Sequence, residues 1–132
     1  MKEEISKLLK LTFLIHFFVA AIFGLVFTIL LDLYVGVVGW PETDQITGRV
    51  LGAVFLGLAA GSLLSWRETK WESVKIVVQM EIVWLAIGLA VHIWAILTQD
   101  FILIIWFQVV LLAIFLGAFI WFYYDQEWAK VK

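Results

Sequence analysis

"GRVLGAVFLGLAAGS", residues Gly48–Ser62, is the stretch that decides how this chain folds. It contains two GxxxG pairs, Gly48 with Gly52 and Gly57 with Gly61. Lipid tails are as apolar as leucine, so helices associate in a bilayer where small residues let their backbones approach closely. Gly52 and Gly57 are five residues apart, which puts the two pairs on different faces. We expect these glycines to pack within one bundle, and a homodimer through one glycine face is the alternative.

The rest of the chain has the composition of a membrane protein. Of its 132 residues, 64% are hydrophobic, whereas soluble domains are about half apolar. The net charge of −2 argues against a nucleic-acid partner. The absence of cysteine excludes disulfides, thiolate nucleophiles and covalent haem attachment. Two histidines alone are too few for a typical metal site, so we expect no metal and a single domain over residues 1–132.

Four segments are long and apolar enough to cross a bilayer as helices, which takes about 20 apolar residues. They cover about residues 11–33, 46–66, 74–98 and 101–124. The connections between them are short, so the sequence predicts an all-α, antiparallel bundle of four transmembrane helices. Lysines before the first segment resemble the start of a signal peptide. Its 21-residue apolar run exceeds the usual core of such peptides, so we expect an uncleaved first helix.

Basic residues indicate the orientation of the bundle. Eight of the nine lysines and arginines lie in the two tails and the loop after the second span, and only Arg49 lies on the other side. Cytoplasmic loops carry an excess of Lys and Arg, so both termini are expected in the cytoplasm, and the expected location is a prokaryotic plasma membrane. The tryptophans predicted at the membrane surfaces are Trp40 outside and Trp66, Trp71, Trp121 and Trp128 inside.

A polar stripe runs along the third span. Glu81, Gly88, His92 and Gln99 are separated by 7, 4 and 7 residues, which places them within about 20° on one helix face. An ionisable residue inside a span is a functional candidate by default. The competing interpretation is helix packing, through Gly88 as a small residue and through interhelical hydrogen bonds worth about 0.6 kcal/mol each.

Two further polar residues match this stripe in depth. His16 lies toward the inner side at about the depth of Glu81, and Gln108 enters the fourth span near the depth of His92. The candidate intramembrane site therefore consists of Glu81, His92, His16, Gln99 and Gln108. The opposite depths of the two histidines argue against a shared haem iron. The sequence gives no support for a quinone site, and we expect no cofactor.

The polar stretch "WPETDQITGRV", residues 40–50, precedes the second span. Pro41, Glu42 and Asp44 suit the start of a helix, because proline fits the first turn and carboxylates favour the positive end of the helix dipole. Arg49 has no carboxylate three or four residues away on its own helix. We therefore expect Arg49 to reach lipid phosphate or to pair across helices with one of two outer carboxylates, Asp32 or Asp100.

Motifs of common enzymes are absent from the sequence. It contains no HExxH, GxSxG, phosphate-binding loop or dinucleotide fingerprint, so we do not expect an enzyme. We expect a non-enzymatic accessory, assembly or structural component in the lipid bilayer, within a homo-oligomer or a larger membrane complex. The alternative is a small binding or transport protein that uses a polar cleft around Glu81 and His92 for a proton, a small solute or a lipid.

Residues 47–84, "TGRVLGAVFLGLAAGSLLSWRETKWESVKIVVQMEIVW", resemble small uncharacterised four-helix integral membrane proteins of bacteria and archaea. The shared pattern is an arginine followed by small residues, then a short charged loop with tryptophan, then an apolar helix. The resemblance implies a four-span bundle. It implies no known activity and transfers no functional residue.

Overall fold

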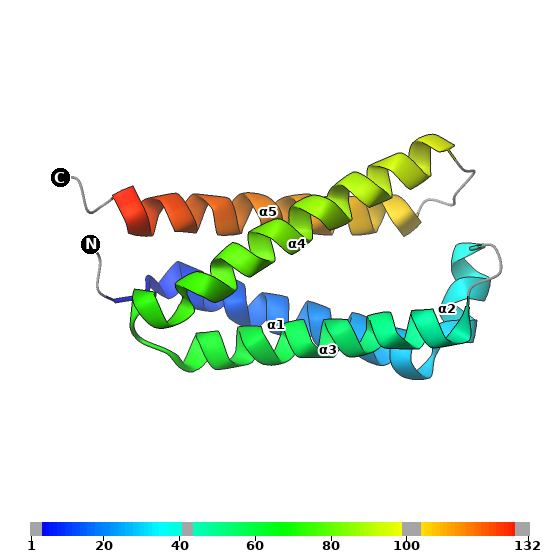
Figure 1. The fold of residues 1–132 in the computed structure, drawn as a ribbon, viewed down its shortest axis with the longest axis horizontal. Coiled ribbons are helices and arrows are strands. Elements are labelled where there is room, and N and C mark those ends of the chain that lie inside the picture. Colours follow the sequence, from blue (N-terminus) through cyan, green and yellow to red (C-terminus); the bar gives the residue numbers. More distant parts are fainter. Residues whose placement is uncertain (1–3, 41–43, 99–103, 129–132) are drawn as a thin grey trace.

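The computed structural model describes residues 4–40, 44–98 and 104–128. Their helices, in chain order, are α1 (Lys7–Ile29), α2 (Leu31–Val38), α3 (Gln45–Arg67), α4 (Trp71–Thr98) and α5 (Ile104–Trp128). All but α2 are long and apolar enough to span a membrane (Figure 1). The predicted all-α fold with four membrane-spanning helices is confirmed.

The first predicted span is broken into two helices. α1 begins at Lys7 rather than near residue 11, because the Ser6 hydroxyl accepts a hydrogen bond from the Leu9 amide at 3.1 Å. α1 ends at Ile29, and α2 starts after Leu30 instead of the helix continuing to residue 33. Near this break the Thr28 hydroxyl donates to the Gly24 carbonyl at 2.7 Å, a contact that bends helices.

The polar stretch before α3 starts that helix, as its acidic residues predicted. Asp44 is the N-cap residue, and its carboxylate accepts hydrogen bonds from the Ile46 and Thr47 amides at 3.3 and 3.1 Å. Pro41 and Glu42, which also entered that prediction, lie outside the described residues.

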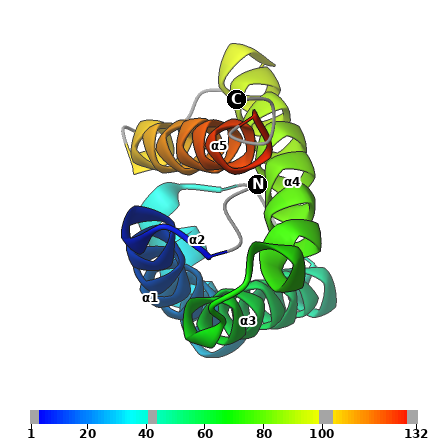
Figure 2. The ribbon, with the colours of Figure 1, turned by 90° about the vertical axis from the view of Figure 1, so that its left-hand side faces the viewer.

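The four long helices form two pairs. α1 and α3 lie side by side along most of their lengths, and α5 packs mainly on α4. α4 crosses the bundle diagonally, as Figure 1 shows, and it contacts α3 much less than α1 does. Seen from one end, α1, α3, α4 and α5 surround a common centre (Figure 2). The pairing leaves the middle of the bundle as the place where all four helices face one another.

One of the two GxxxG pairs packs α3 against α1 and the start of α2. Gly48 packs on the Leu31 side chain, and a Cβ atom at Gly52 would lie 2.6 Å from the Thr28 backbone nitrogen. Gly24 of α1 is equally close to α3, where a Cβ would lie 3.0 Å from the Leu56 nitrogen. Both helices thus contribute small residues to this interface, as the expectation of packing within the bundle required.

The second GxxxG pair does not form an equivalent contact. Gly57 has no atom within 4 Å of the position a Cβ would take, and Gly61 meets only Val77, at 4.0 Å. The shared motif therefore serves as a helix contact only at its first occurrence among the described residues.

The most deeply buried apolar cluster lies toward one end of the bundle. It contains Ile5, Leu9, Phe13, Trp71, Val74, Val78, Leu85, Phe115 and Phe119. Trp71 is fully buried in this cluster, and its indole N–H donates to the Glu127 carboxylate at 2.7 Å. Trp71 begins α4 and faces the inside of the bundle, and its predicted depth at the inner membrane surface stays a prediction.

Candidate functional site

A cavity of about 110 Å³ lies in the middle of the bundle, between all four long helices. Most of its wall is aliphatic or aromatic, and its polar side chains are those of His16, His92 and Gln108. The remaining lining residues are Val19, Ala20, Phe23, Leu51, Phe55, Leu58, Trp84, Leu85, Gly88, Leu111, Leu112 and Phe115. Three members of the predicted polar site therefore share one cavity.

A buried polar row stands at one side of this cavity. The His16 Nδ1 atom lies 2.8 Å from the Ser62 hydroxyl, and its Nε2 atom lies 3.6 Å from a Glu81 carboxyl oxygen. All three side chains are buried. The expected proximity of His16 and Glu81 is thus present, and it joins α1, α3 and α4.

Ser62 was missed as a member of this row. The residue is fourteen positions after Gly48, which places it within about 40° of the glycine face that packs on α1. That spacing was the signal in the sequence that Ser62 points toward α1 and its histidine.

Glu81 lacks a hydrogen-bond partner among the described residues. Both carboxyl oxygens are buried without one, since 3.6 Å to His16 exceeds hydrogen-bond length. Glu81 does not line the cavity, whereas His16 does. His16 therefore lies between the Glu81 carboxyl group and the cavity. The carboxyl group and the imidazole, which can each carry a proton, lie one behind the other.

The opposite end of the cavity presents His92 and Gln108. His92 Nδ1 lies 2.8 Å from the Gly88 carbonyl of its own helix. The Gln108 side-chain amide donates to the Tyr34 hydroxyl, and its carbonyl oxygen is buried without a partner. No hydrogen bond joins His92 to Gln108 within the described segments. The expected meeting of these two residues is thus a shared cavity wall rather than a direct contact.

Tyr34 belongs to α2, outside the membrane-spanning segments, and ties this helix to α5 through Gln108. Burial raises the pKa of Tyr34 to about 12, and the hydrogen bond from Gln108 lowers it by a smaller amount. The phenol therefore keeps its proton at neutral pH. Its ring packs on Phe27 and Trp40, with centroid distances of 4.7 and 5.7 Å.

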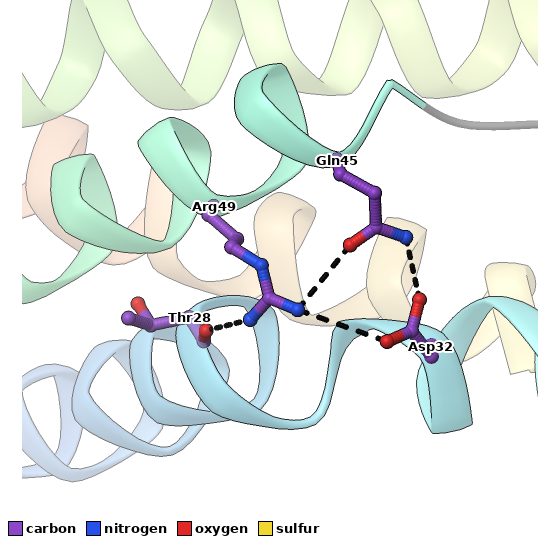
Figure 3. Close-up of polar contacts among 4 residues, drawn as sticks. All are labelled: Thr28, Asp32, Gln45 and Arg49. Atoms are coloured by element: carbon purple, nitrogen blue, oxygen red, sulfur yellow. Dashed lines mark hydrogen bonds and ion pairs between the residues drawn. The ribbon is translucent and has the colours of Figure 1, made fainter.

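Arg49 forms a second polar cluster, beside the break between α1 and α2 (Figure 3). Its guanidinium donates to the Thr28 carbonyl and to the Gln45 side-chain oxygen, the latter at 3.2 Å. The same group lies 3.7 Å from the Asp32 carboxylate, which also accepts from the Gln45 amide. The structure therefore brings Arg49 and Asp32 together across helices.

The Arg49 side chain supplies a hydrogen-bond donor to a carbonyl in the last turn of α1. Carbonyls in the last turn of a helix have no partner within that helix, and a cation there interacts favourably with the negative end of the helix dipole. The Arg49 and Asp32 side chains are 41% and 74% exposed, so their ion pair itself is worth little. The contact with the Thr28 carbonyl carries more of the structural role.

Two predicted site residues, Gln99 and Asp100, lie outside the described residues. Within the described ranges, no three His, Asp or Glu side chains form a group that could hold a metal ion. The two histidines line one cavity, but both ring nitrogens of His16 face Ser62 or Glu81. The geometry offers no pair of free histidine nitrogens to one iron.

Comparison with known proteins adds no relative to this description. No protein-family model, curated protein or solved structure matches the chain.

Proposed function

We propose that the protein is a small membrane binding or transport protein whose central cavity accepts a small, largely apolar molecule. The observation that supports this proposal is the cavity itself, which all four long helices line and which has polar side chains at both ends. Binding sites in proteins typically combine an apolar wall with a few convergent polar groups. A purely structural bundle has no need for such a space.

The size of the cavity limits the ligand. Its volume is about 110 Å³, whereas one water molecule needs about 10–15 Å³ and a cavity of about 150 Å³ accepts benzene. Phe23, Phe55, Trp84 and Phe115 provide an aromatic lining. The enclosed space suits a short chain, and a single ring fits where the cavity opens toward the surface of the bundle, whereas a complete lipid exceeds these dimensions.

The proposed setting is a prokaryotic plasma membrane with both termini in the cytoplasm. Eight of the nine basic residues support this orientation, because they lie in the tails, in the first turn of α1, or in and next to the connection between α3 and α4. In this orientation the Glu81–His16 pair lies toward the cytoplasm, and His92 and Gln108 lie toward the outside. The two polar ends of the cavity then face opposite sides of the membrane.

Filling the cavity tests the proposal. The probe is 4-fluorotoluene, followed by fluorine NMR with the protein in lipid nanodiscs, and empty nanodiscs correct for partition into lipid. We expect saturable binding to the natural protein and its loss in Gly88→Leu, because Gly88 lines the cavity. Leu112→Phe fills the same space and serves as a second variant, since Leu112 is the residue nearest to a Cβ at Gly88.

The matched control is Gly57→Leu, which adds the same side chain where no atom lies within 4 Å of the new Cβ. This variant should bind the probe like the natural protein. Equal binding by Gly88→Leu, Leu112→Phe and the natural protein would show that the probe does not enter the cavity, and the proposal would be wrong.

An accessory or assembly role is the second candidate. The observation that favours it is the face of α3 formed by Ala53, Gly57 and Ala60, which is exposed and carries only small side chains. Small residues on an open face allow a further helix to approach. Blue-native electrophoresis after mild extraction tests this role. A monodisperse monomer without any accompanying protein would rule it out.

A further inference from the structure

We propose that the cavity selects ligands that carry a neutral hydrogen-bond donor, such as a hydroxyl, and binds that donor at the His92 and Gln108 end. This inference rests on the proposed binding function and adds the chemical class of the ligand. It follows from two acceptor atoms for which the described residues supply no donor.

The first acceptor is Nε2 of His92. A carbonyl oxygen only accepts hydrogen bonds, so the 2.8 Å contact with the Gly88 carbonyl requires the proton on Nδ1. In the tautomer that carries its proton on Nδ1, Nε2 is the acceptor of the ring. This nitrogen lies on the side of the ring opposite to the helix backbone contact. It has no hydrogen-bond partner among the residues that the structure describes.

The second acceptor is the side-chain oxygen of Gln108. The amide group is oriented by its hydrogen bond to the Tyr34 hydroxyl, and this leaves the oxygen buried and unpaired. Gln108 is only 8% exposed and lines the cavity. The Gln108 oxygen is therefore reached from the cavity rather than from the outer surface of the bundle.

Unpaired acceptors at one end of an apolar cavity favour one kind of ligand. A buried polar group without a partner costs free energy, so a ligand that brings a donor gains more than one that does not. Among the described residues no acidic side chain lines the cavity, so a cationic donor would be buried there without an opposite charge. The preferred ligand is therefore a neutral donor on a small apolar body.

A pair of probes that differ in one hydrogen-bond donor tests this inference. 4-Fluorophenol and 4-fluoroanisole share the ring, and only the phenol carries a hydroxyl. With the natural protein in nanodiscs, we expect fluorine NMR titrations to give about 5- to 10-fold tighter binding of the phenol. Empty nanodiscs again correct for the different partition of the two probes.

Two variants locate the preference. His92→Phe and Gln108→Met each remove one acceptor at similar size, and each should reduce the preference for the phenol to about 2-fold or less. The readout in each variant is the ratio of the two affinities rather than either affinity alone. The control is Gln79→Met, because Gln79 is an amide on α4 outside this cavity, bonded to Tyr123 at 3.1 Å. It should retain the full preference.

The outcomes separate this inference from the proposed function. If 4-fluoroanisole binds as tightly as the phenol, or if both variants keep the preference, the donor inference is wrong while the cavity remains a binding site. If neither probe binds and Gly88→Leu changes nothing, the proposed function fails as well. Should one variant lack a thermal unfolding transition, the other acceptor still provides the test.

Discussion

Gly52 and Gly88 both lie within membrane-spanning helices, but the space next to each glycine differs. At Gly52 a Cβ atom would lie 2.6 Å from the Thr28 backbone nitrogen, whereas at Gly88 it would make ordinary contact with Leu112 at 3.9 Å. One glycine lets α1 and α3 approach, and the other leaves room at the cavity. The same residue type therefore serves close packing on one side of the bundle and an open centre on the other.

The polar groups of the two regions differ in the same way. At the α1–α3 side, Arg49, Gln45 and Asp32 satisfy one another and the Thr28 carbonyl. In the bundle centre, Glu81 and Gln108 have buried oxygens without partners. In the closely packed region between α1 and α3, hydrogen-bond donors and acceptors are matched. In the centre of the bundle, buried acceptors have no donor among the described residues.

The largest expected effect comes from adding one methyl group to each glycine. Gly52→Ala should destabilise the protein by about 2–3 kcal/mol, because the new methyl overlaps backbone atoms that cannot move aside. Gly88→Ala should leave stability unchanged or raise it by up to about 1 kcal/mol through better helix propensity. Thermal unfolding in one detergent, followed by circular dichroism, compares the two. Equal losses would contradict the difference in packing.

Glu81→Leu is expected to have the next largest effect, and to stabilise the bundle. The carboxyl oxygens are buried without a hydrogen bond, so an apolar side chain of similar size removes an unmet cost of about 1–2 kcal/mol. Glu81→Gln, which keeps a polar group in place, serves as the control and should not show this gain. A clear drop in melting temperature for the leucine variant would mean that the pair with His16 stabilises the fold.

Arg49 should contribute about 1 kcal/mol through the end of α1. Arg49→Ala leaves the Thr28 carbonyl without its donor, and this loss should exceed that of Asp32→Asn, since the ion pair is exposed. Arg49→Lys should recover only part, because an ammonium lacks the planar fork that serves several acceptors. Denaturation curves of the three variants rank these contributions. A larger loss for Asp32→Asn would assign the stability to the ion pair instead.

The smallest expected effect concerns pH and Asp44. Hydrogen bonds from the Thr47 hydroxyl, the Thr47 amide and the Ile46 amide lower the pKa of Asp44 in the folded protein. The unfolded pKa is about 3.9, so the contribution of this cap is fully present above that pH. It is lost as the pH falls through the lower, folded value. The melting temperatures of the natural protein and Asp44→Ala should differ at pH 7 and converge below about pH 4. A constant difference would contradict the role of the carboxylate.

Hydropathy was sufficient to predict the four spans, because their length and apolar character follow from the bilayer itself. The end of α1 could not be predicted, since residues 25–31 contain no glycine, proline or charged residue that would mark a break. What breaks the helix is local and tertiary: a threonine hydroxyl bonded to Gly24, and an arginine from another helix on the Thr28 carbonyl.

The sequence predicted a contact within the candidate site where that contact depends only on the depth of the two residues along their helices. The rise of 1.5 Å per residue was enough to bring His16 near Glu81. It was not enough for Gln108, whose partner is Tyr34 on α2 rather than His92. The sequence could not reveal this pairing, because α2 exists as a separate helix only through the break at Leu30.

Because of the break at Leu30, a small change in the angle between α1 and α2 displaces Tyr34. Tyr34 lies four residues beyond the break, which is about 6 Å along the helix axis. A rotation of α2 by about 10° around Leu30 shifts the Tyr34 backbone by about 1 Å, which changes the length and direction of the hydrogen bond with Gln108. Arg49 contacts both sides of the break, through Thr28 before it and Asp32 after it. The Arg49 contacts at the edge of the bundle thus hold the angle between α1 and α2. Through Tyr34, α2 in turn orients the Gln108 side chain.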